Sequence, residues 1–358
     1  MNKKLLSISG LLLLLFSACN TVDTGVLLNH FQTPQEDHPA LTRLFSDQYA
    51  IIPLETTDDC LLGAITKIKK HKGHYYISTT DGKSLYRFNE QGQFINALHK
   101  QGQGPGEYIR IEDFDVYEID GKQEIWISDN KNLKIYDADN GSFKHQISFP
   151  FFIYKFRRLE SSHILLVTNK DKTLALTDEQ GNILKEELKK EIPYIMFRPV
   201  QFVRHNNQYL FQLGISNSFI AFDRSDETFK EGMYTNEASF LSKEQLLELF
   251  NTQGMEYIAA AYKQSFIDNV ITTGKATWLI TNHKGALFLT RCDKDGQVST
   301  RMQYGSLFST LIVGDSEESI LLYADFEQLE ESGLNLQDKN GKTIEREIDD
   351  NPCLIEFF

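Results

Sequence analysis

Cysteine is scarce in this sequence, with only four among 358 residues. None belongs to a CxxC motif or lies at metal-ligand spacing from a histidine, which argues against a zinc site. Cys19 lies in the N-terminal leader discussed below, and Cys60, Cys292 and Cys353 remain. Three cysteines cannot form a fully paired disulfide framework. A Cys60–Cys353 bridge fits the architecture predicted below, but buried free thiols are the favoured interpretation.

Positive charge is also in short supply. Lys and Arg total 37 against 50 Asp and Glu, which gives a formal net charge of −13. This balance opposes binding to a phosphate backbone or to anionic lipid headgroups. The sequence therefore predicts no nucleic-acid partner, and attachment to a membrane would need an anchor other than surface charge.

Long apolar runs are absent, and the longest, residues 5–16, is too short to span a bilayer. Two lysines precede it and Ser17-Ala18 follow it, the arrangement typical of a signal peptide with a small-residue cleavage site. We expect residues 1–18 to be a signal peptide of the lipoprotein type, for the reason given next.

The residue after the cleavage site is Cys19, and this arrangement resembles the bacterial lipobox, whose cysteine is lipidated. A plain signal peptide that is cut nearby is the alternative. Several acyl chains anchor a protein stably where one does not, so the membrane is an expected partner through the lipid on Cys19. Residues 19–47 are predicted to be the lipidated cysteine and a flexible tether, because the segment after Cys19 is polar and irregular.

Several motifs for chemistry are incomplete or missing. The sequence has no GxSxG nucleophile elbow, and the histidine pair in "HKGH" at 71–74 lacks a third ligand nearby. The Asp-rich turns at 137–141 and 293–296 resemble calcium loops but lack the later acidic ligand. We therefore predict no metal and no cofactor. The glycine-rich loop "HKQGQGPGEY" (99–108) is followed by a strand pattern and not by the helix that a phosphate site requires.

A repeated strand pattern dominates what is present. Five segments read as β-hairpins, with apolar alternation on either side of a polar turn, and each follows further apolar strands. They cover residues 85–98, 133–147, 174–188, 219–233 and 287–302. The turn residues Gly92, Gly141 and Gly181 are 49 and 40 residues apart, which is the period of a propeller blade.

The count gives five complete four-stranded units and an incomplete sixth, residues 309–326 with the terminal strand 353–358. The spare strand is 49–56, near the beginning of the chain. Pairing it with the terminal strand would close the ring and remove exposed sheet edges. The predicted fold class is all-β: residues 48–358 form a six-bladed β-propeller of four-stranded antiparallel blades, closed by the N-terminal strand in the last blade.

Two stretches interrupt the repeat and predict short helical insertions. Residues 239–251 have apolar residues at helical spacing, with Ser242 as N-cap and Gln245 three residues later. Residues 326–352 are polar and read as partly helical. Insertions in repeat proteins gather on the face used for binding, so these two point to a binding face.

Four features together resemble a known family: the lipobox, "IIPLETTDDCLLGAITKI", "GQGPGEYIRIEDFDV" and the terminal "DDNPCLIEFF". They are similar to the six-bladed β-propeller lipoproteins of the Bacteroidota, which are related in architecture to NHL-repeat propellers. The resemblance covers residues 49–358. It implies the fold and a location in the bacterial cell envelope, lipid-anchored, at the outer membrane. It provides no catalytic set that could be carried over.

The glycine-rich loop joins the outermost strand of blade one to the innermost strand of blade two. Its predicted structural residues are Gly102, Gly104, Pro105 and Gly106. This connection would place Glu107, Tyr108 and Arg110 near the mouth of the central channel, as candidate ligand contacts. In the alternative interpretation the loop packs two blades together and Glu107 pairs locally with Arg110.

Further candidates lie on the innermost strands. Asp113 and Asp115 share one face of a strand, about 7 Å apart, which fits an inverting glycosidase pair only loosely and fits a hydrated channel lining better. Arg157, Arg158 and Arg198 fall at or near the innermost strands of blades three and four. They could bind a carboxylate ligand, although pairing with acidic neighbours is favoured.

These observations favour a noncatalytic binding or scaffolding propeller that presents one face to a glycan, a peptide or an envelope protein. The alternative is a hydrolase or lyase acting on a glycan or peptide at the channel mouth, through Asp113, Asp115, Glu107 or Arg110. The sequence leans against an enzyme because it contains neither a nucleophile motif nor a metal set.

Overall fold

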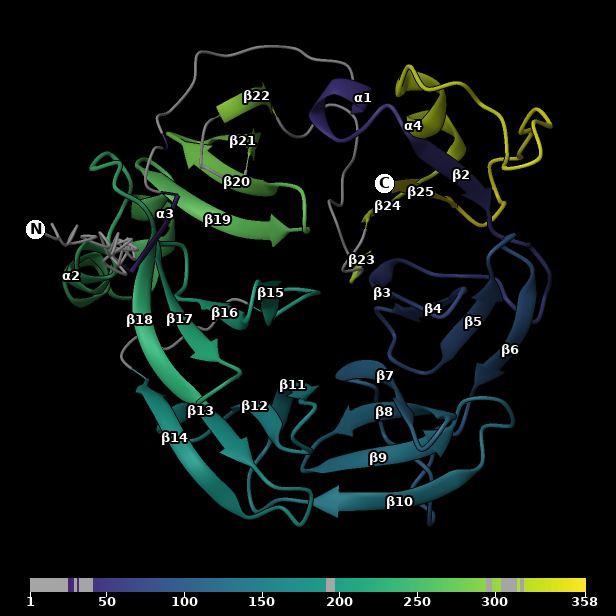
Figure 1. The fold of residues 1–358 in the computed structure, drawn as a ribbon, viewed down its shortest axis with the longest axis horizontal. Coiled ribbons are helices and arrows are strands. Elements are labelled where there is room, and N and C mark those ends of the chain that lie inside the picture. Colours follow the sequence, from purple (N-terminus) through teal and green to yellow (C-terminus); the bar gives the residue numbers. More distant parts are fainter. Residues whose placement is uncertain are drawn as a thin grey trace, which may run out of the picture.

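The computed structural model describes residues 25–28, 31, 41–190, 197–293, 298–303, 314–315 and 319–358. Six sheets stand around a common centre, each forming one blade of a ring (Figure 1). The predicted six-bladed β-propeller is therefore confirmed.

Blades 1 to 5 each contain four consecutive antiparallel strands. Blade 1 has β3 (Ile65–His71), β4 (His74–Thr79), β5 (Leu85–Asn89) and β6 (Phe94–Leu98). Blade 2 has β7 (Asp113–Ile119), β8 (Lys122–Asp129), β9 (Asn132–Asp137) and β10 (Phe143–Ser148). Blade 3 has β11 (Ile153–Arg158), β12 (Ile164–Thr168), β13 (Lys172–Thr177) and β14 (Ile183–Lys189). Blade 4 has β15 (Val203–His205), β16 (Gln208–Gln212), β17 (Ser218–Asp223) and β18 (Thr228–Thr235). Blade 5 has β19 (Ser265–Thr272), β20 (Thr277–His283), β21 (Ala286–Cys292) and β22 (Val298–Gln303).

Blade 6 closes the ring as predicted. Its described strands are β24 (Ile320–Ala324), β25 (Cys353–Phe357) and, at the outer position, β2 (Tyr49–Pro53). Ile51 lies directly opposite Ile355 in the antiparallel pair. Residues 309–313 and 316–318 of the predicted sixth unit lie outside the described residues, whereas β23 (Gly314–Asp315) pairs in parallel with β3 of blade 1.

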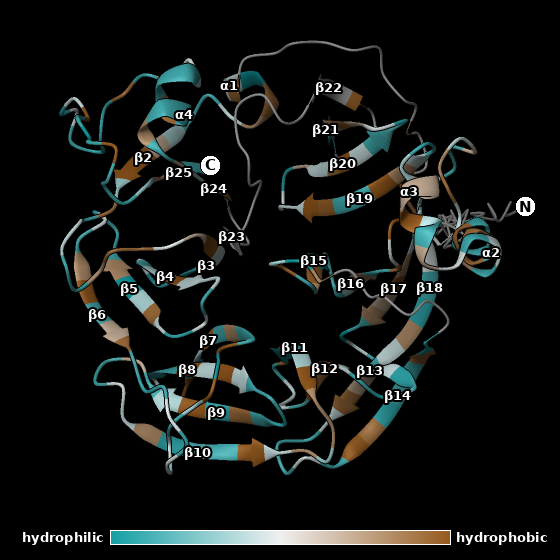
Figure 2. Cartoon of the chain, turned by 180° about the vertical axis from the view of Figure 1, so that it is seen from behind, coloured by the Kyte–Doolittle hydropathy of each residue, from teal (hydrophilic) through white to brown (hydrophobic). Residues whose placement is uncertain are grey.

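The core lies between the blades, because alternating residues of each strand point to the two neighbouring sheets. The bands of hydrophobic and hydrophilic residues along the strands show this alternation (Figure 2). Tyr76 of blade 1 packs with Phe114 and Ile127 of blade 2, and Trp126 on the other side of blade 2 packs with Phe156 of blade 3. Each of these interfaces between blades is thus a small hydrophobic core of its own.

One hairpin glycine has a clear structural requirement. Gly92 turns β5 into β6 with a φ of 79°. A Cβ atom at this position would lie 2.1 Å from the carbonyl oxygen of Pro53, at the end of β2. The turn of blade 1 therefore lies directly against the closing strand of blade 6, and only glycine fits there.

The N-terminal segment differs from the predicted flexible tether wherever the structure describes it. β1 (Val26–Leu28) pairs in parallel with β18, at the outer edge of blade 4. Leu28 and Phe31 are buried in the core between blades 4 and 5, and α1 (Leu41–Leu44) buries its leucines between blades 5 and 6. The tether prediction for 19–47 is wrong for these residues, because their apolar side chains have partners on three blades. Cys19 and residues 1–18 lie outside the described part of the chain.

The predicted helical insertions are confirmed. The first contains α2 (Lys243–Gln253), the 3-10 turn η1 (Gly254–Glu256) and α3 (Tyr257–Ala261). Ser242 and Gln245 form the predicted capping box at the start of α2. The second insertion contains α4 (Phe326–Glu331). Among the described residues, no helix combines the length and the apolar character needed to cross a membrane.

The three cysteines outside the leader are free and buried. Cys60 donates to the carbonyl oxygen of Glu55, and its sulfur lies 3.2 Å from the hydroxyl of Thr57. The favoured interpretation as buried thiols is confirmed, and the alternative of a Cys60–Cys353 bridge is wrong.

Candidate functional site

The ring has two different faces. The first strands of the blades run in the same direction, so the segments that lead into them lie on one face, which we call the connection face. It consists of residues 54–64, 99–112, 149–152, 197–202 and 236–264, together with the insertion 325–352. The opposite face carries the turn after the first strand of each blade, and we call it the hairpin face. Both helical insertions and the glycine-rich loop therefore lie on the same side of the molecule.

The glycine-rich loop is held in shape by its own glutamate. The Glu107 N–H donates to the Gly104 carbonyl at 3.1 Å, and the Glu107 carboxylate accepts from the Gly104 N–H at 2.7 Å. A Cβ atom at Gly102 would lie 2.0 Å from the Glu107 carboxylate oxygen. A side chain at Gly102 would therefore displace the Glu107 carboxylate from its position over the loop.

The loop also packs on blade 2. The Tyr136 hydroxyl donates to the Gly106 carbonyl at 3.1 Å, and the Lys134 ammonium group donates to the Glu107 carbonyl. Gly106 has a φ of 76°, and a Cβ there would be 2.8 Å from atoms of the Phe143 side chain. These contacts support the interpretation that the loop packs blades together.

Tyr108 is fully buried at the junction of blades 1 and 2. Its hydroxyl lies 2.7 Å from the Lys83 carbonyl and 2.9 Å from the Leu98 carbonyl, and it accepts from the Lys100 N–H. Burial raises the pKa of Tyr108 to about 12. The Tyr108 side chain therefore stabilises the junction between the two blades. It has no exposed surface with which to make the ligand contact that had been predicted for it.

Arg110 is exposed on the connection face. It donates to the Thr80 carbonyl at 2.8 Å and lies 3.7 Å from the carboxylate of Glu112. The predicted local pair between Glu107 and Arg110 is wrong, because the Glu107 carboxylate is turned back toward Gly104 and Arg110 contacts Thr80 and Glu112.

Asp113 is buried between the innermost strands of blades 1, 2 and 3. It lies 2.9 Å from the ammonium nitrogen of Lys67 on β3 and 3.5 Å from that of Lys155 on β11. Lys67 also donates to the Phe114 carbonyl at 2.7 Å, and Asp113 accepts from the Phe156 N–H at 3.3 Å. This carboxylate therefore joins three blades.

Asp115 repeats the arrangement two residues further along β7. It is 0% exposed, lies 2.8 Å from Arg157 of β11 and 3.4 Å from Lys69 of β3, and accepts from the Tyr117 hydroxyl at 2.9 Å. The prediction that Asp113 and Asp115 form a hydrated channel lining is wrong. Both are buried in ion pairs, because the first strands of blades 1 and 3 carry cations at the positions that face them.

We call Lys67, Lys69, Asp113, Asp115, Lys155 and Arg157 the charge ladder. Its four cations outnumber its two carboxylates. Burial lowers the pKa of Lys155, although Asp113 acts in the opposite direction. Burial also lowers the pKa of His71, which follows Lys69 on the same strand, and the charge of Lys69 lowers it further. The ladder fixes the angle between blades and presents no carboxylate in a position to exchange protons with a ligand.

The remaining two candidates are arginines that pair with acidic neighbours, as favoured. Arg158 donates to Glu179 at 2.7 Å and to Ser162 at 3.0 Å, within blade 3. Arg198 is buried and donates to the backbone carbonyl of Asp268 at 2.8 Å, so it joins blades 4 and 5. Neither arginine points to a ligand site that the structure describes.

The lysines of the ladder were not identified as partners from the sequence, whereas Arg157 was expected to pair with an acidic neighbour and does so with Asp115. The signal is present in "ITKIKK" and "IYKFRR", where basic residues alternate at the same two-residue spacing as Asp113 and Asp115. Within the described residues, no cluster of three His, Cys, Asp or Glu side chains could hold a metal ion.

The connection face exposes large apolar side chains at every junction between blades for which the structure describes them. These residues are Leu61, Ile109, Phe152, Phe197, Met255 and Tyr262, and the insertion adds Ile348, which is 95% exposed. Of the other exposed large apolar residues in the described part of the chain, four lie on outer strands and Phe358 lies on the hairpin face. Apolar exposure is thus concentrated on one face.

One part of the connection face is strongly acidic. Residues 54–64 and 325–352 contain twelve Asp or Glu and three Lys or Arg, and we call them the acidic sector. Asn351 joins the two segments: it accepts from the Leu62 N–H at 2.8 Å and donates to the Glu55 carbonyl at 2.6 Å. Leu61 and Ile348 are therefore exposed apolar side chains in a surface of negative charge.

Residues 32–355 match the model of a protein family described as a domain of unknown function, DUF4934. The fold is similar to the crystal structure of a protein from Bacteroides fragilis that is described as exported, with a TM-score of 0.69. The two sequences are 17% identical, and the match covers 90% of this chain and 97% of that one. A member of the DUF4221 family from Bacteroides vulgatus is 10% identical with a TM-score of 0.53, covering 89% and 96%. At these identities the likeness shows the fold. No curated protein shows significant similarity to the sequence.

Proposed function

Because the chain belongs to the DUF4934 family, whose description assigns no function, we propose a function from its surface: it is a noncatalytic binding propeller of the bacterial cell envelope. Its connection face docks an envelope protein or peptide that carries basic and apolar side chains. The proposal includes a lipid anchor on Cys19 and a location at the outer membrane, which rest on the lipobox-like leader. The exported relative from Bacteroides fragilis is consistent with this location.

The observation that carries the proposal is the combination of exposed apolar residues and acidic charge on one face. Leu61 is 57% exposed and Ile348 is 95% exposed, both within the acidic sector. Burying such side chains against a partner is favourable at roughly 25 cal/mol per Å². The surrounding carboxylates would attract a basic surface and repel an acidic one, which gives the interaction its selectivity.

The hydrolase or lyase alternative finds no support in the described residues. Of its four candidate residues, Asp113 and Asp115 are bound to cations of the neighbouring blades, and Arg110 donates to the Thr80 carbonyl. Glu107 closes its own loop through the N–H of Gly104. A glycan enters only as an outcome of the experiment below, because the acidic sector favours a cationic partner over a neutral sugar.

The test is site-specific photo-crosslinking of the mature protein in envelope extract. A crosslinker at position 348 should capture a basic partner, and capture should fall with added salt and in Leu61→Glu. The matched control is position 95, because Ile95 is an exposed apolar residue on the outer strand β6. Equal capture at both positions, or turnover of a glycan by the purified protein, would overturn the proposal.

A further inference from the structure

The connection face carries a second charged sector, opposite in sign to the acidic one. It lies over blade 3 and the junctions on either side of it, and it consists of residues 130–131, 149–152, 169–172, 189–190 and 197. Five of these residues are lysines and one is an aspartate, so we call this surface the basic sector. Backbone hydrogen bonds join its segments. The Asn169 N–H donates to the Phe152 carbonyl at 3.2 Å, and the Lys190 N–H donates to the Asp171 carbonyl at 2.7 Å.

The lysines of the basic sector are open to a partner. Lys170 pairs with the Glu186 carboxylate of β14. The other four are exposed and, in the described part of the chain, no carboxylate forms an ion pair with them: Lys131, Lys172, Lys189 and Lys190. In a chain whose net charge is −13, this surface keeps a positive potential that attracts a carboxylate-rich one.

The basic sector also exposes aromatic rings. Phe152 is 41% exposed, and the ammonium group of Lys131 lies 5.4 Å from the centroid of its ring. Phe197 is 46% exposed, and its ring lies 4.8 Å from that of Tyr154 on β11. The basic sector therefore has the same form as the acidic sector, in which charges surround exposed apolar side chains, but the sign of the charge is reversed.

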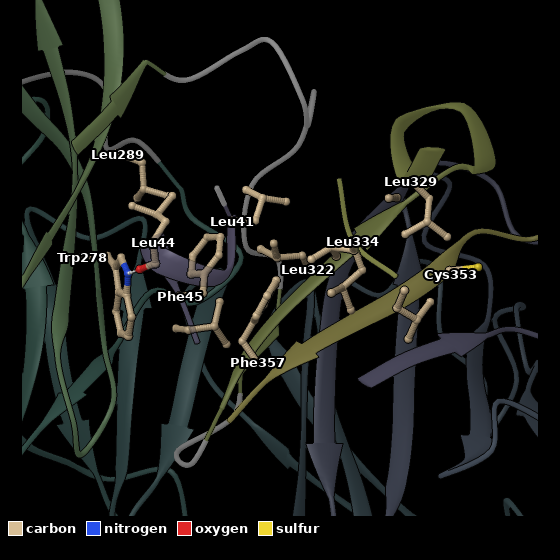
Figure 3. Close-up of a cluster of buried hydrophobic side chains, with 14 of the residues drawn as sticks. Leu41, Leu44, Phe45, Trp278, Leu289, Leu322, Leu329, Leu334, Cys353 and Phe357 are labelled. Atoms are coloured by element: carbon tan, nitrogen blue, oxygen red, sulfur yellow. Dashed lines mark hydrogen bonds between the residues drawn. The ribbon is translucent and has the colours of Figure 1, made fainter. Parts of the chain in front are cut away.

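The hairpin face offers no comparable surface among the described residues. Near this face the aromatic side chains of Phe45, Trp278 and Phe357 are packed against one another in the core between blades 5 and 6 (Figure 3). All three are buried, and Phe358 is the only large apolar side chain that the described residues expose there. A partner that buries apolar area therefore binds the connection face.

The two sectors lie on opposite sides of the ring. The acidic sector is at blade 6 and its junction with blade 1, whereas the basic sector is centred on blade 3 (Figure 1). A two-fold axis that lies between two copies, parallel to their connection faces, would bring the acidic sector of each copy onto the basic sector of the other. This single operation satisfies both pairs of sectors, so the assembly closes at two copies.

We infer that the partner of the acidic sector is the basic sector of a second copy of this chain, so that the protein forms a two-fold dimer through its connection faces. The inference rests on the proposed function, because it names the partner of the docking face. Opposite potentials favour this contact over the pairing of like sectors. Phe152 and Phe197 of one copy meet Leu61 and Ile348 of the other, which excludes water from the apolar centre of each contact.

The two-fold axis passes close to the junction of blades 4 and 5, which is about equally far around the ring from the two sectors (Figure 1). Met255 and Tyr262 are exposed at that junction and therefore lie near the same residues of the other copy. β1, at the outer edge of blade 4, is on the same side of the dimer in both copies. If Cys19 carries the lipid, both anchors can enter one membrane.

Sedimentation velocity of the purified mature protein tests the dimer. The wild type should be dimeric at low ionic strength, and added salt should shift it to monomer, because the contact depends on opposite charges. A first variant reverses the basic sector with Lys131→Glu, Lys189→Glu and Lys190→Glu, and it should dimerise at least about tenfold more weakly. These side chains are exposed, so its thermal unfolding should match that of the wild type.

The decisive sample is a mixture of two variants. The second variant reverses the acidic sector with Asp58→Lys, Asp59→Lys and Asp349→Lys, and it should also dimerise at least about tenfold more weakly. Mixed in equal amounts, the two variants should form a heterodimer as tightly as the wild type forms its dimer, because each reversed sector then meets one of opposite sign. The matched control is Lys122→Glu with Lys275→Glu, two exposed lysines on the hairpin face, which should leave the dimer unchanged.

Three results would overturn the inference: a wild type that stays monomeric at low ionic strength, a basic-sector variant that dimerises like the wild type, or a mixture of the two variants that stays monomeric. The crosslinker at position 348 separates this failure from that of the proposed function. If it captures a different basic protein while the wild type is monomeric, the docking function stands and the dimer is wrong. Capture of the basic sector of a second copy would support both.

Discussion

At the scale of single residues, the charge ladder shows how buried charges are used in this ring. Asp115 is 0% exposed and has Arg157 at 2.8 Å on one side and Lys69 at 3.4 Å on the other. A buried ion pair does little for stability compared with an apolar pair of the same shape, but breaking one is costly because it leaves a buried charge without its partner. The ladder therefore penalises any arrangement of blades that separates these residues.

We predict that Asp115→Asn lowers the free energy of unfolding by about 3–5 kcal/mol, because Arg157 and Lys69 stay buried and lose the opposing charge. Urea denaturation of the mature domain measures this loss. The control is Asp139→Asn: Asp139 pairs with Arg87 at 2.9 Å, but its side chain is 79% exposed, and such a pair contributes less than about 1 kcal/mol. Equal losses in the two variants would contradict the prediction.

At the scale of elements, the glycine-rich loop keeps its conformation through steric fit and hydrogen bonds to blade 2, and it has no catalytic group in a position to act. A Cβ at Gly102 would lie only 2.0 Å from the Glu107 carboxylate oxygen, so the two cannot keep their present positions together. The loop reaches across to β9, where Lys134 and Tyr136 bind its carbonyl groups. Its shape is thus part of the junction between blades 1 and 2.

We predict that Gly102→Ala destabilises the protein by about 0.5–1.5 kcal/mol, because the Glu107 carboxylate must move away and lose its hydrogen bond from the Gly104 N–H. Adding Glu107→Ala should recover part of this loss, because it removes the atoms that the new methyl group contacts. Thermal unfolding of the two variants and of Gly63→Ala checks this. At Gly63 a Cβ would meet no atom of the described chain within 4 Å, so this position should tolerate alanine. A loss at Gly102 no greater than that at Gly63 would refute the steric argument.

At the scale of the whole molecule, the ring is closed by the pairing of β2 with β25. Ile51 and Ile355 face each other across this pair and are 1% and 0% exposed. Blade 6 receives its outer strand from the other end of the chain, so cooperative unfolding of the ring should depend on this contact.

We predict that Ile51→Ala and Ile355→Ala each cost about 2–5 kcal/mol, the range for buried Ile to Ala changes. In the double variant the loss should be less than the sum of the two single values, because both changes remove the same contact. Equilibrium unfolding monitored by fluorescence and by circular dichroism gives the three values. Strict additivity would show that the two strands stabilise the ring independently.

The blades, their closure and α2 could be predicted from the sequence, because apolar alternation and the Ser242 capping box are local signals. It was not sufficient for the partners of Asp113 and Asp115, since these depend on the angle between blades. Tyr108 was expected at the surface because it lies in a loop. Its burial depends on tertiary contacts that the local sequence does not reveal. β1 was missed because three apolar residues, Val26–Leu28, are too few to show a period.

If the protein is lipid-anchored at Cys19, the position of β1 on the outer edge of blade 4 limits how far the propeller can lie from the membrane. Gly25 lies against Glu231 and Gly232 of β18, so the linker between the lipidated residue and the propeller consists only of the chain from Cys19 to Gly25. Six residue steps span at most about 22 Å when fully extended, at ~3.6 Å each. The outer edge of blade 4 would then lie near the lipid headgroups. The ring would be attached to the membrane at its side and not at one of its two faces.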